Sequence, residues 1–398
     1  MYHNRLLAAT LQHAVGSFPA VLVTGPRQSG KTTFLRHQLG ESADYVSFDD
    51  PLEQEFARID PSGFLSRFGL RPVILDEIQY VPDLMPHLKL RIDASPDRLG
   101  RWILTGSQQF ALMHGVSESL AGRVAILELP PFSHLELAGR SLEASIWDGG
   151  YPIPALHPER RALWLNSYLA TYIERDVRQL RSISDLRAFT QFVSLCAAHH
   201  AQTFSAAGLS RQVGVTLPTI QAWSGVLEAS YVAVLLKPWF RNYGKRVVKS
   251  PKLYFLDPAL VCMLTRQPDA ASALSGSLGG ALFEGWVITE AIKAFMARGL
   301  KPDLHFWRSH DGLELDLLIS AAGIQVPVEI KLSASPSAGH LAPIEKWIAL
   351  AGGDSAPQGL LVCRTERERH MPGGHLALPW QRFPAWIADL LDGARPVG

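Results

Sequence analysis

The stretch Gly25-Pro-Arg-Gln-Ser-Gly-Lys-Thr32 follows the apolar run Ala20–Val23 and precedes a segment that can form a helix. It fits the pattern GxxxxGK[ST] in the strand-then-helix context that this pattern requires. Such a turn aims backbone N–H groups and a helix N-terminus at phosphates, and glycine lets the backbone approach without a Cβ clash. We therefore predict that this turn binds the phosphates of a nucleotide.

Single residues of the turn have distinct expected roles. Lys31 is predicted to contact the β- and γ-phosphates of ATP, and the Thr32 hydroxyl is predicted to ligate Mg²⁺. The motif taken alone also fits a tight turn that binds nothing. The other candidates for phosphate binding are Gly25, Pro26, Arg27, Gln28, Ser29, Gly30 and Thr33.

A second apolar run, Pro72-Val-Ile-Leu-Asp-Glu77, ends in two carboxylates. At the carboxyl end of a parallel strand, these acids are expected beside the nucleotide. Asp76 is predicted to hold Mg²⁺, directly or through water, and Glu77 to orient or deprotonate the attacking water. ATP and Mg²⁺ are thus the expected cofactors, and ATP hydrolysis is the expected reaction.

Two further regions are candidates for roles in hydrolysis. The run Trp102-Ile-Leu-Thr-Gly-Ser107 ends in hydroxyls, so Thr105 or Ser107 could sense the γ-phosphate; a polar strand end that satisfies the backbone is the alternative. Arg123 is a candidate arginine finger for a neighbouring subunit, which would require a homo-oligomer. The alternative for Arg123 is a surface arginine in a weak ion pair.

The order of apolar runs predicts an α/β chain of three domains. Short β-rich runs alternate with helix-length stretches from about residue 20 to 128, which is typical of a parallel, doubly wound sheet. We expect a P-loop ATPase domain at 1–150, a helical connector with a winged helix at 151–266, and an α/β domain at 267–398. The expected strands of the first domain are Ala20–Val23, Tyr45–Phe48, Val73–Leu75, Trp102–Leu104 and Val124–Leu127.

The remainder of the chain has recognisable patterns as well. Helical spacing runs through 160–198, and 205–228 has the spacing of a helix-turn-helix. The small residues of 267–281 are typical of a linker. Beyond them we expect helices near 283–297 and 343–350 and strands at 315–319, 327–331 and 359–363.

Composition limits the classes of protein that fit. With 398 residues, 47% hydrophobic and 19% charged, the chain can bury the cores of two or three domains. No stretch has the roughly 18 apolar residues that span a bilayer, so we expect a cytoplasmic protein without a membrane partner. The cysteines Cys196, Cys262 and Cys363 form no CxxC pair, which argues against disulfides and zinc. A net charge of +1 gives no global case for nucleic acid.

These motifs together resemble a family of prokaryotic AAA-type P-loop ATPases. Its members pair an N-terminal ATPase domain with a C-terminal domain of uncharacterised function, related to the PD-(D/E)xK nuclease fold. The resemblance implies an AAA-like core, a winged-helix middle and a restriction-endonuclease-like end. The segments that carry it are GPRQSGKTT, VILDEIQ, LTGSQ, SLAGRVAILELPPFS, YIERDV, RNYGKRVVKSPKLYFLDPAL, ALFEGWVITE, ELDLLI and PVEIKLS.

A second candidate site lies in the C-terminal part. Asp316 is expected to close one strand, and alternation places Glu329 and Lys331 on one face of the next. Two carboxylates would hold Mg²⁺ while Lys331 polarises the nucleophile or neutralises phosphate, and Glu284 on the preceding helix could complete the metal shell. The alternative is an ion pair between Glu329 and Lys331 on an exposed face.

The middle of the chain is locally basic. Between residues 237 and 252 there are no acids, and such a run after a helix-turn-helix could lie along DNA phosphates. The alternative is that the basic run is a solvated face or docks on the acidic face of a neighbouring domain. Its basic residues are Lys237, Arg241, Lys245, Arg246, Lys249 and Lys252; the weaker candidates for base contacts are Thr216, Thr219 and Gln221.

Two functions from different classes fit these patterns. The first is an ATPase whose nucleotide state regulates a nuclease-like domain that acts on or binds DNA. The second is a slow ATP switch whose C-terminal domain binds DNA or a partner protein without cleaving anything. Glu77 favours hydrolysis over mere binding, and Asp316 with Lys331 favours chemistry over a scaffold role.

Overall fold

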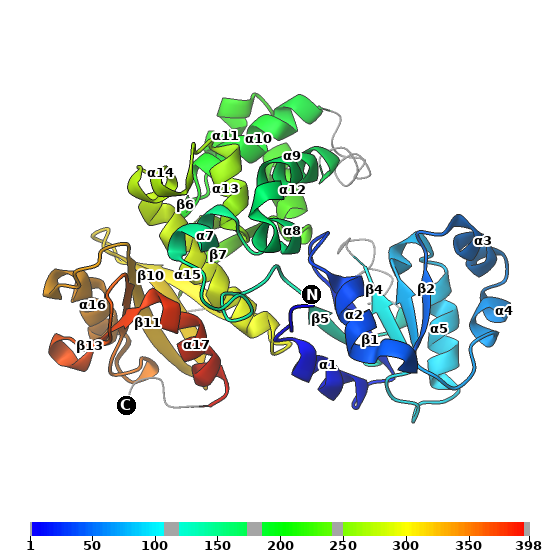
Figure 1. Cartoon of the computed structure of the whole chain (residues 1–398). Helices are drawn as coiled ribbons and strands as arrows, with labels where there is room; N and C mark the ends of the chain where they lie inside the picture. Colours follow the sequence, from blue (N-terminus) through cyan, green and yellow to red (C-terminus); the bar gives the residue numbers. More distant parts are fainter. Residues whose placement is uncertain (1, 107–118, 173–184, 241–249, 394–398) are drawn as a thin grey trace. The chain divides into compact units, whose positions relative to one another are not determined.

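The computed structural model describes residues 2–106, 119–172, 185–240 and 250–393. The chain forms two compact units, and the blue and cyan ribbon of Figure 1 is the N-terminal part of unit 1. Unit 1 comprises Met1–Phe132, Ala229–Tyr231 and Met296–Leu300. Unit 2 comprises Ser133–Glu228, Val232–Phe295 and Lys301–Gly398.

Unit 1 is built on a five-stranded sheet in the order β2-β3-β4-β1-β5. All of its neighbouring strands are parallel. The predicted parallel α/β sheet is therefore confirmed, and every expected strand is present close to its expected bounds. The strands are β1 (Ala20–Thr24), β2 (Asp44–Ser47), β3 (Val73–Asp76), β4 (Trp102–Thr105) and β5 (Val124–Glu128).

Helices cover both faces of this sheet. Phe34 packs with Val21 on one face, and Phe64 packs with Leu22 on the other. Because both faces are buried, the central strands are uninterrupted apolar runs rather than alternating ones. The helices are α1 (Ala8–Val15) and α2 (Lys31–Leu39) on the first face, and α3 (Pro51–Ile59), α4 (Pro61–Ser66) and α5 (Leu84–Asp93) on the second.

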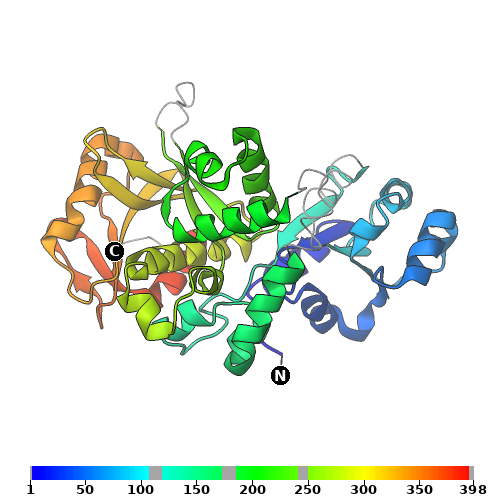
Figure 2. The same cartoon turned by 90° about the horizontal axis from the view of Figure 1, so that it is seen from above.

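Unit 2 contains a nine-stranded mixed sheet in the order β13-β14-β12-β11-β10-β9-β7-β8-β6. Figure 2 shows its central strands in yellow and orange. Strand β11 is antiparallel to β10 but parallel to β12. The strands are β6 (Gln202–Thr203), β7 (Ala233–Pro238), β8 (Lys252–Phe255), β9 (Leu304–Arg308), β10 (Glu314–Ala321), β11 (Ile324–Lys331), β12 (Leu360–Cys363), β13 (Arg369–His370) and β14 (Leu376–Pro379).

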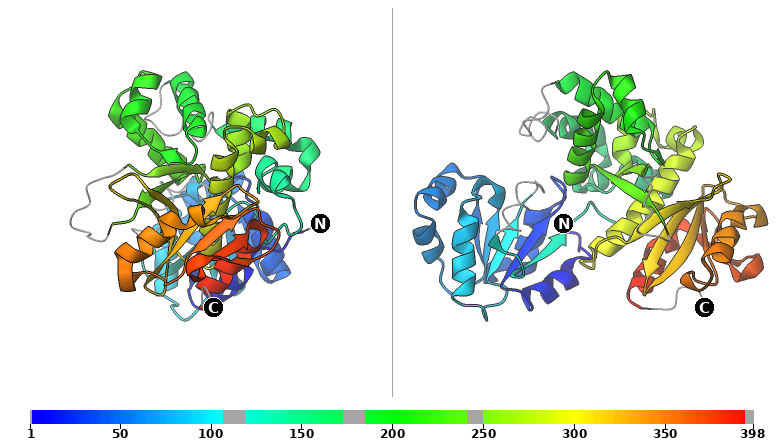
Figure 3. Two further views of the ribbon diagram at one scale, coloured as in Figure 1. Left: turned by 90° about the vertical axis from the view of Figure 1, so that its left-hand side faces the viewer. Right: turned by 180° about the vertical axis from the view of Figure 1, so that it is seen from behind.

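Helices account for most of the rest of unit 2, as the two views of Figure 3 show. On one face of the sheet, Ile344 and Trp347 pack on Leu318 and Leu361. The helices after β5 are α7 (Leu142–Trp147), α8 (Pro152–Leu156), α9 (Arg161–Thr171), α10 (Leu186–Ala198), α11 (Ala206–Val213), α12 (Leu217–Ala229), α13 (Pro258–Leu264), α14 (Ala270–Ser275), α15 (Gly279–Met296), α16 (Ala342–Ala351) and α17 (Phe383–Leu391).

The helices expected over 205–228 are present as α11 and α12. The Ser205 hydroxyl accepts a hydrogen bond from Gly208 N and caps α11, which ends at Gly214 with a φ of 80°. Glycine adopts this left-handed conformation without strain, so it stops the helix. Of the helical spacing expected over 160–198, α9 and α10 are present, and residues 173–184 lie outside the described residues.

The prediction of a linker at 267–281 is wrong. Helix α14 lies inside it, capped by Asp269, whose side chain accepts from Ser272 N at 2.8 Å. Its Leu274 is buried, and a Cβ on Gly279 would lie 1.9 Å from the Leu274 carbonyl oxygen. The small residues therefore permit close packing of the backbone here.

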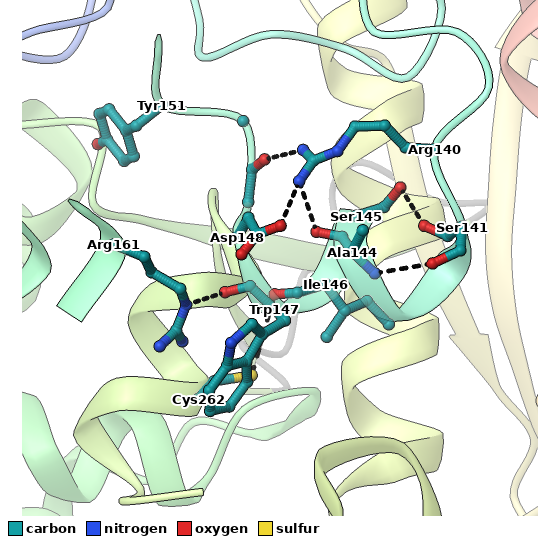
Figure 4. Close-up of polar contacts among 12 residues, drawn as sticks. Arg140, Ser141, Ala144, Ser145, Ile146, Trp147, Asp148, Tyr151, Arg161 and Cys262 are labelled. Carbon is teal, nitrogen blue, oxygen red and sulfur yellow. Dashed lines mark hydrogen bonds and ion pairs between the residues drawn. The ribbon is translucent and has the colours of Figure 1, made fainter. Parts of the chain in front are cut away.

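A polar cluster closes the C-terminal end of α7 (Figure 4). Arg140 donates to the Gly149 carbonyl at 2.8 Å and forms an ion pair with Asp148 at 2.6 Å. Arg161 donates to the Trp147 carbonyl at 2.5 Å, with its guanidinium over the Trp147 ring. Because the last carbonyls of a helix lack partners within it, these arginines supply the missing donors.

Cys196, Cys262 and Cys363 are buried free thiols in the described part of the chain. Within the described ranges, no helix combines the length and apolar character needed to cross a membrane.

Candidate functional site

The loop between β1 and α2 has the backbone that phosphate binding requires. Gly25 has a φ of 138°, and a Cβ on it would lie 2.4 Å from the Leu129 carbonyl oxygen. Gly30, the N-cap of α2, has a φ of 91°. Only glycine fits both positions without strain or overlap. The first turn of α2 therefore begins directly after the loop, so its N–H groups, which lack carbonyl partners within the helix, lie beside the loop.

Lys31 is folded back over this loop. Its Nζ donates to the Gly25 carbonyl at 3.1 Å and to the Pro26 carbonyl at 2.9 Å, and the residue is 6% exposed. These two carbonyls hold the ammonium against the loop. The predicted contact of Lys31 with phosphates is compatible with this position and stays a prediction.

Asp76 lies at the carboxyl end of β3 with hydroxyls around it. Thr32 Oγ1 donates to Asp76 Oδ2 at 2.8 Å, and Tyr45 Oη donates to the same oxygen at 2.8 Å. Thr105 Oγ1 donates to Asp76 Oδ1. The predicted magnesium ligands Thr32 and Asp76 are therefore in direct contact, although 44 residues separate them in the sequence.

Tyr45 was not predicted from the sequence. Burial, with the hydrogen bond to Asp76, raises the pKa of Tyr45 to about 12, so its hydroxyl stays a donor at neutral pH. The residue begins a β-rich run, and nothing in that run distinguishes a tyrosine that faces a carboxylate from one that faces solvent. The pairing of β2 with β3, in which Tyr45 lies opposite Ile74, brings the two residues together.

Glu77 follows Asp76 in a left-handed conformation, with a φ of 58°. Its backbone N donates to Thr105 Oγ1 at 3.0 Å, and its carboxylate accepts from Gln79 Nε2. The Thr105 hydroxyl donates to Asp76 and accepts from the Glu77 backbone N, so it satisfies polar groups at the end of the strand. This arrangement is the alternative to a sensor role for Thr105. Ser107, the other sensor candidate, lies outside the described residues.

The remaining loop residues differ in exposure. Pro26 is buried, Arg27 is half-buried, and Gln28 and Thr33 are exposed. Ser29 is fully buried, and its Oγ has no hydrogen-bond partner among the described residues. An unpaired buried hydroxyl is costly, so Ser29 fits a loop that is completed by phosphate oxygens.

Arg5 supports the loop from the N-terminal segment. It is 5% exposed, and its guanidinium donates to the Ser29 carbonyl at 2.9 Å and to the Pro130 carbonyl at 2.5 Å. The same guanidinium lies 4.6 Å from the centre of the Phe132 ring. Arg5 was not predicted as a site residue, because an isolated arginine 20 residues before the motif belongs to no recognisable sequence pattern.

Arg123 lies at the amino-terminal end of the strands, whereas the phosphate loop lies at their carboxyl-terminal end. Its carbonyl accepts from the backbone N of Ala20, the first residue of β1, whereas the loop follows the end of that strand. Its side chain makes a two-point ion pair with Asp93, at 2.5 and 3.2 Å, and this pair lowers the pKa of Asp93. The finger role of Arg123 stays a prediction.

The predicted C-terminal residues come together in unit 2. Asp316 Oδ2 accepts from Ile330 N at 3.0 Å and from Lys331 Nζ at 3.3 Å. Lys331 Nζ also lies 2.5 Å from Glu329 Oε1. Asp316 was expected to close its strand, but it lies near the start of β10, beside a register shift between Leu315 and Leu318. The second carboxyl oxygen of Glu329 has no partner among the described residues.

Lys252, which we predicted to lie along DNA phosphates, belongs to the same group of charged residues. Lys252 Nζ lies 2.8 Å from Glu284 Oε1 and 2.5 Å from Glu314 Oε1, and the residue is 4% exposed. Tyr254 Oη donates to Glu284 Oε1 at 2.6 Å. Lys252 was expected in a basic run along DNA phosphates; it is buried against acids instead, so that expectation is wrong for this residue.

We call the four carboxylates Glu284, Glu314, Asp316 and Glu329 the acid cluster. Burial and the neighbouring Asp316 raise the pKa of Glu284 to about 7 and that of Glu329 to about 8. Within the described part of the chain, no three His, Cys, Asp or Glu side chains are arranged to hold a metal ion. The predicted ligands Glu284, Asp316 and Glu329 therefore share a cluster but not a coordination shell.

Little of the basic run can be seen. Arg241, Lys245, Arg246 and Lys249 lie outside the described residues. Lys237 is exposed, and Trp239 packs edge-on against Trp347, with ring centres 4.7 Å apart. At the start of α12, Thr216 and Gln221 are exposed, and the Thr216 and Thr219 hydroxyls are 2.7 Å apart.

Three protein families match successive parts of the chain. Residues 17–138 match an AAA domain. Residues 139–271 match a domain of unknown function, DUF8612, and residues 279–383 match another, DUF4143. The phosphate loop and the two acids at the end of β3 both fall inside the AAA match.

Relatives that match most of the chain are found in mycobacteria. The uncharacterized protein Rv2008c of Mycobacterium tuberculosis is 35% identical over 342 residues, which cover 85% of this chain and 76% of the relative. The uncharacterized protein Mb2031c of Mycobacterium bovis matches to the same extent. The shared length includes more than the AAA domain alone.

Similar solved structures are more distant. The Walker-type ATPase PABY2304 of Pyrococcus abyssi is 17% identical, with a TM-score of 0.42, over 65% of this chain and 94% of that one. The RuvB Holliday junction branch migration motor of Thermotoga maritima is 17% identical, with a TM-score of 0.29, over 57% and 88%.

Proposed function

The chain belongs to the family of AAA-domain proteins that includes Rv2008c, and we propose on that basis that it binds ATP with Mg²⁺ and hydrolyses it. The observation that carries the proposal is the contact between Thr32 and Asp76 directly below the phosphate loop. A hydroxyl and a carboxylate in contact at the end of a helix-capped loop are the protein ligands that a nucleotide-bound Mg²⁺ takes in P-loop enzymes.

In this proposal each residue acts on a stated part of the reaction. Backbone N–H groups of the loop and Lys31 would hold the β- and γ-phosphates, while Thr32 and Asp76 would hold Mg²⁺. The metal would offset the charge that develops on the phosphate oxygens. Glu77 orients the attacking water and accepts its proton. Arg5 holds the loop in its binding conformation through the Ser29 carbonyl.

Nucleotide binding tests the first half of this proposal. Titration of a fluorescent ATP analogue should show binding to the wild type and a loss of at least about tenfold in affinity for Lys31→Ala, since a charged phosphate contact contributes roughly 1.5–3 kcal/mol. Lys301→Ala, which removes an exposed lysine, is the matched control. Equal affinities for wild type and Lys31→Ala would contradict the site.

We propose three domains, at 1–150, 151–266 and 267–398, with a nuclease-like fold in the last. What supports this fold is the order of elements from α15 through the antiparallel β9, β10 and β11 to α16 and the parallel β12. Asp316, Glu329 and Lys331 meet on this framework. ATP would then regulate a domain that acts on DNA; the alternative is a slow switch that binds without cleaving.

Cleavage assays separate these two outputs. Single- and double-stranded DNA are incubated with wild type and with Asp316→Ala, in Mg²⁺ or Mn²⁺, with and without ATP. Cleavage by the wild type alone supports a nuclease, and no cleavage under any condition supports the switch.

DNA binding by a winged-helix middle is a separate proposal. It is supported by the exposed start of α12 after the turn at Gly214 and by the exposed Lys237 on β7. Fluorescence anisotropy with duplex DNA at several salt concentrations tests it. Lys237→Ala should lower the slope of log affinity against log salt by about 1, because each phosphate contact releases roughly one counterion.

The finger role of Arg123 requires a homo-oligomer and release of Asp93. If Arg123 acts in a neighbouring subunit, ATP turnover per chain should rise with protein concentration, and Arg123→Ala should flatten that rise. A turnover that is independent of concentration would leave Arg123 as the partner of Asp93 only.

A further inference from the structure

Lys252 is a buried ammonium between carboxylates. It lies 2.8 Å from Glu284 and 2.5 Å from Glu314, and its side chain is 5% exposed. A buried charge is tolerated only when it is paired, so these contacts fix the position of Lys252. Tyr254, from the same strand, donates to Glu284 and holds that carboxylate against the lysine.

The acid cluster has more carboxylates than ammonium groups. Lys252 pairs with Glu284 and Glu314, and Lys331 pairs with Asp316 and Glu329. One oxygen of Glu329 has no partner among the described residues, although Glu329 is 2% exposed. The cluster therefore has carboxylate oxygens beyond those paired with the lysines, and a divalent cation prefers such oxygen ligands.

The lysine and the acids come from different parts of the chain. Lys252 is on β8, within the segment that matches DUF8612, whereas the four acids lie in the segment that matches DUF4143. Lys252 is the first residue of β8, which pairs with β7 and β6 and whose residues are all buried. A residue from outside the acid-bearing segment therefore supplies one cation of the acid cluster.

We propose that Lys252 is the resident cation of the acid cluster and that it competes with a divalent metal ion for these carboxylates. Two cations cannot share Glu284 without strong repulsion, because Coulomb repulsion at such distances is little screened in the interior. The inference rests on the proposed nuclease-like role of the C-terminal domain. It gives Lys252, in the middle segment, a direct influence on metal binding in that domain.

Metal binding to the full chain tests the proposal without any need for cleavage. Isothermal titration with Mn²⁺ should give at least about tenfold tighter binding to Lys252→Met than to wild type, the scale on which groups beside a metal site change its affinity. Lys252→Arg keeps the charge and should bind Mn²⁺ as weakly as wild type. Adding Asp316→Asn to Lys252→Met should abolish the gain, which locates it in the acid cluster. Binding to Lys252→Met no tighter than to wild type would overturn the proposal.

A measurement on the wild type covers the case in which Lys252→Met does not fold. Acylation of lysines, followed by mass spectrometry, should leave Lys252 unmodified without metal and modify it in millimolar Mn²⁺, since the displaced ammonium becomes accessible. Lys301, which is exposed, should react equally in both conditions. Protection of Lys252 that Mn²⁺ does not change would overturn the proposal. Tight Mn²⁺ binding without DNA cleavage would contradict only the proposed nuclease activity and not the role of Lys252.

Discussion

Thr32 Oγ1 donates to Asp76 Oδ2 across 2.8 Å, and this contact joins the start of α2 to the end of β3. Strand β4 lies between β1 and β3 in the sheet, and its Thr105 bonds the other oxygen of Asp76. Together with Tyr45, these hydroxyls hold the carboxylate in one orientation. Preorganisation of this kind avoids the cost of arranging the group during the reaction.

Removing the Thr32 hydroxyl should weaken magnesium more than the fold. Asp76 keeps Tyr45 and Thr105 as donors, so Thr32→Ala should remain folded. The Mg²⁺ concentration for half-maximal ATP turnover should rise by about 10- to 100-fold, as is typical when a group in or beside a metal site is lost. Thr190→Ala, in the exposed part of α10, is the control and should not move it. An unchanged Mg²⁺ requirement would remove Thr32 from the metal site.

A methyl group at Gly25 should disrupt the phosphate loop. It would overlap the Leu129 carbonyl and require an unfavourable φ, at a cost of about 2–5 kcal/mol in unfolding free energy. At Gly122, φ is 76° and no atom lies within 4 Å, so Gly122→Ala carries only the backbone strain of about 1–2 kcal/mol. Urea denaturation of both variants checks the difference. Equal losses would show that the close approach at Gly25 has no energetic weight.

Loss of the Arg5 guanidinium should weaken ATP binding indirectly, through the phosphate loop. Arg5→Met removes two charged hydrogen bonds to carbonyls at 2.9 and 2.5 Å, so we expect a stability loss of about 2–3 kcal/mol. Because one of those carbonyls belongs to Ser29, ATP affinity should fall as well. The binding titration of an ATP analogue checks this, at a temperature where far-UV circular dichroism shows the variant folded. A destabilised variant with wild-type affinity would limit Arg5 to a structural role.

Acid should destabilise unit 2 through His200. The ring is 1% exposed, its Nδ1 accepts from Phe255 N at 3.1 Å, and burial lowers the pKa of His200 to about 3 from its ordinary 6.5. Between those values the unfolded chain binds a proton that the folded chain does not. Stability is therefore lost as pH falls from about 6.5 towards 3.

Replacement of the imidazole isolates this contribution. Urea denaturation of wild type and His200→Gln is compared at a series of pH values from 7 downwards. Below the ordinary pKa of histidine, the unfolding free energy of the wild type should fall with pH more steeply than that of His200→Gln, by the slope that one bound proton gives. Above that pKa the two slopes should be equal. Parallel curves would show that another group causes the acid sensitivity.

The parts of the molecule that follow local rules could be predicted from the sequence. The phosphate loop and β3 combine a short motif with a buried strand, so both their position and their contact at Thr32 and Asp76 follow from the pattern. Helix α11 was predictable for the same reason, since Ser205 caps it and Gly214 ends it. These signals lie within a few residues of the element that they specify.

Contacts made by the tertiary structure could not be predicted. Tyr45 and Arg5 reach the site from separate elements, and neither has a neighbouring residue that marks it. Lys252 belonged by charge to a basic run, but pairing of β8 with β7 buries it against Glu284. The stretch around α14 was expected to be a linker, because small residues permit close packing as well as flexibility.

The most direct test of the central claim is the steady-state rate of ATP hydrolysis by the wild type and by Glu77→Gln, measured beside the binding of an ATP analogue. The account predicts equal binding and a rate about 10²- to 10⁴-fold lower for Glu77→Gln, because the variant loses the base that activates water. Hydrolysis by Glu77→Gln at the wild-type rate would contradict it.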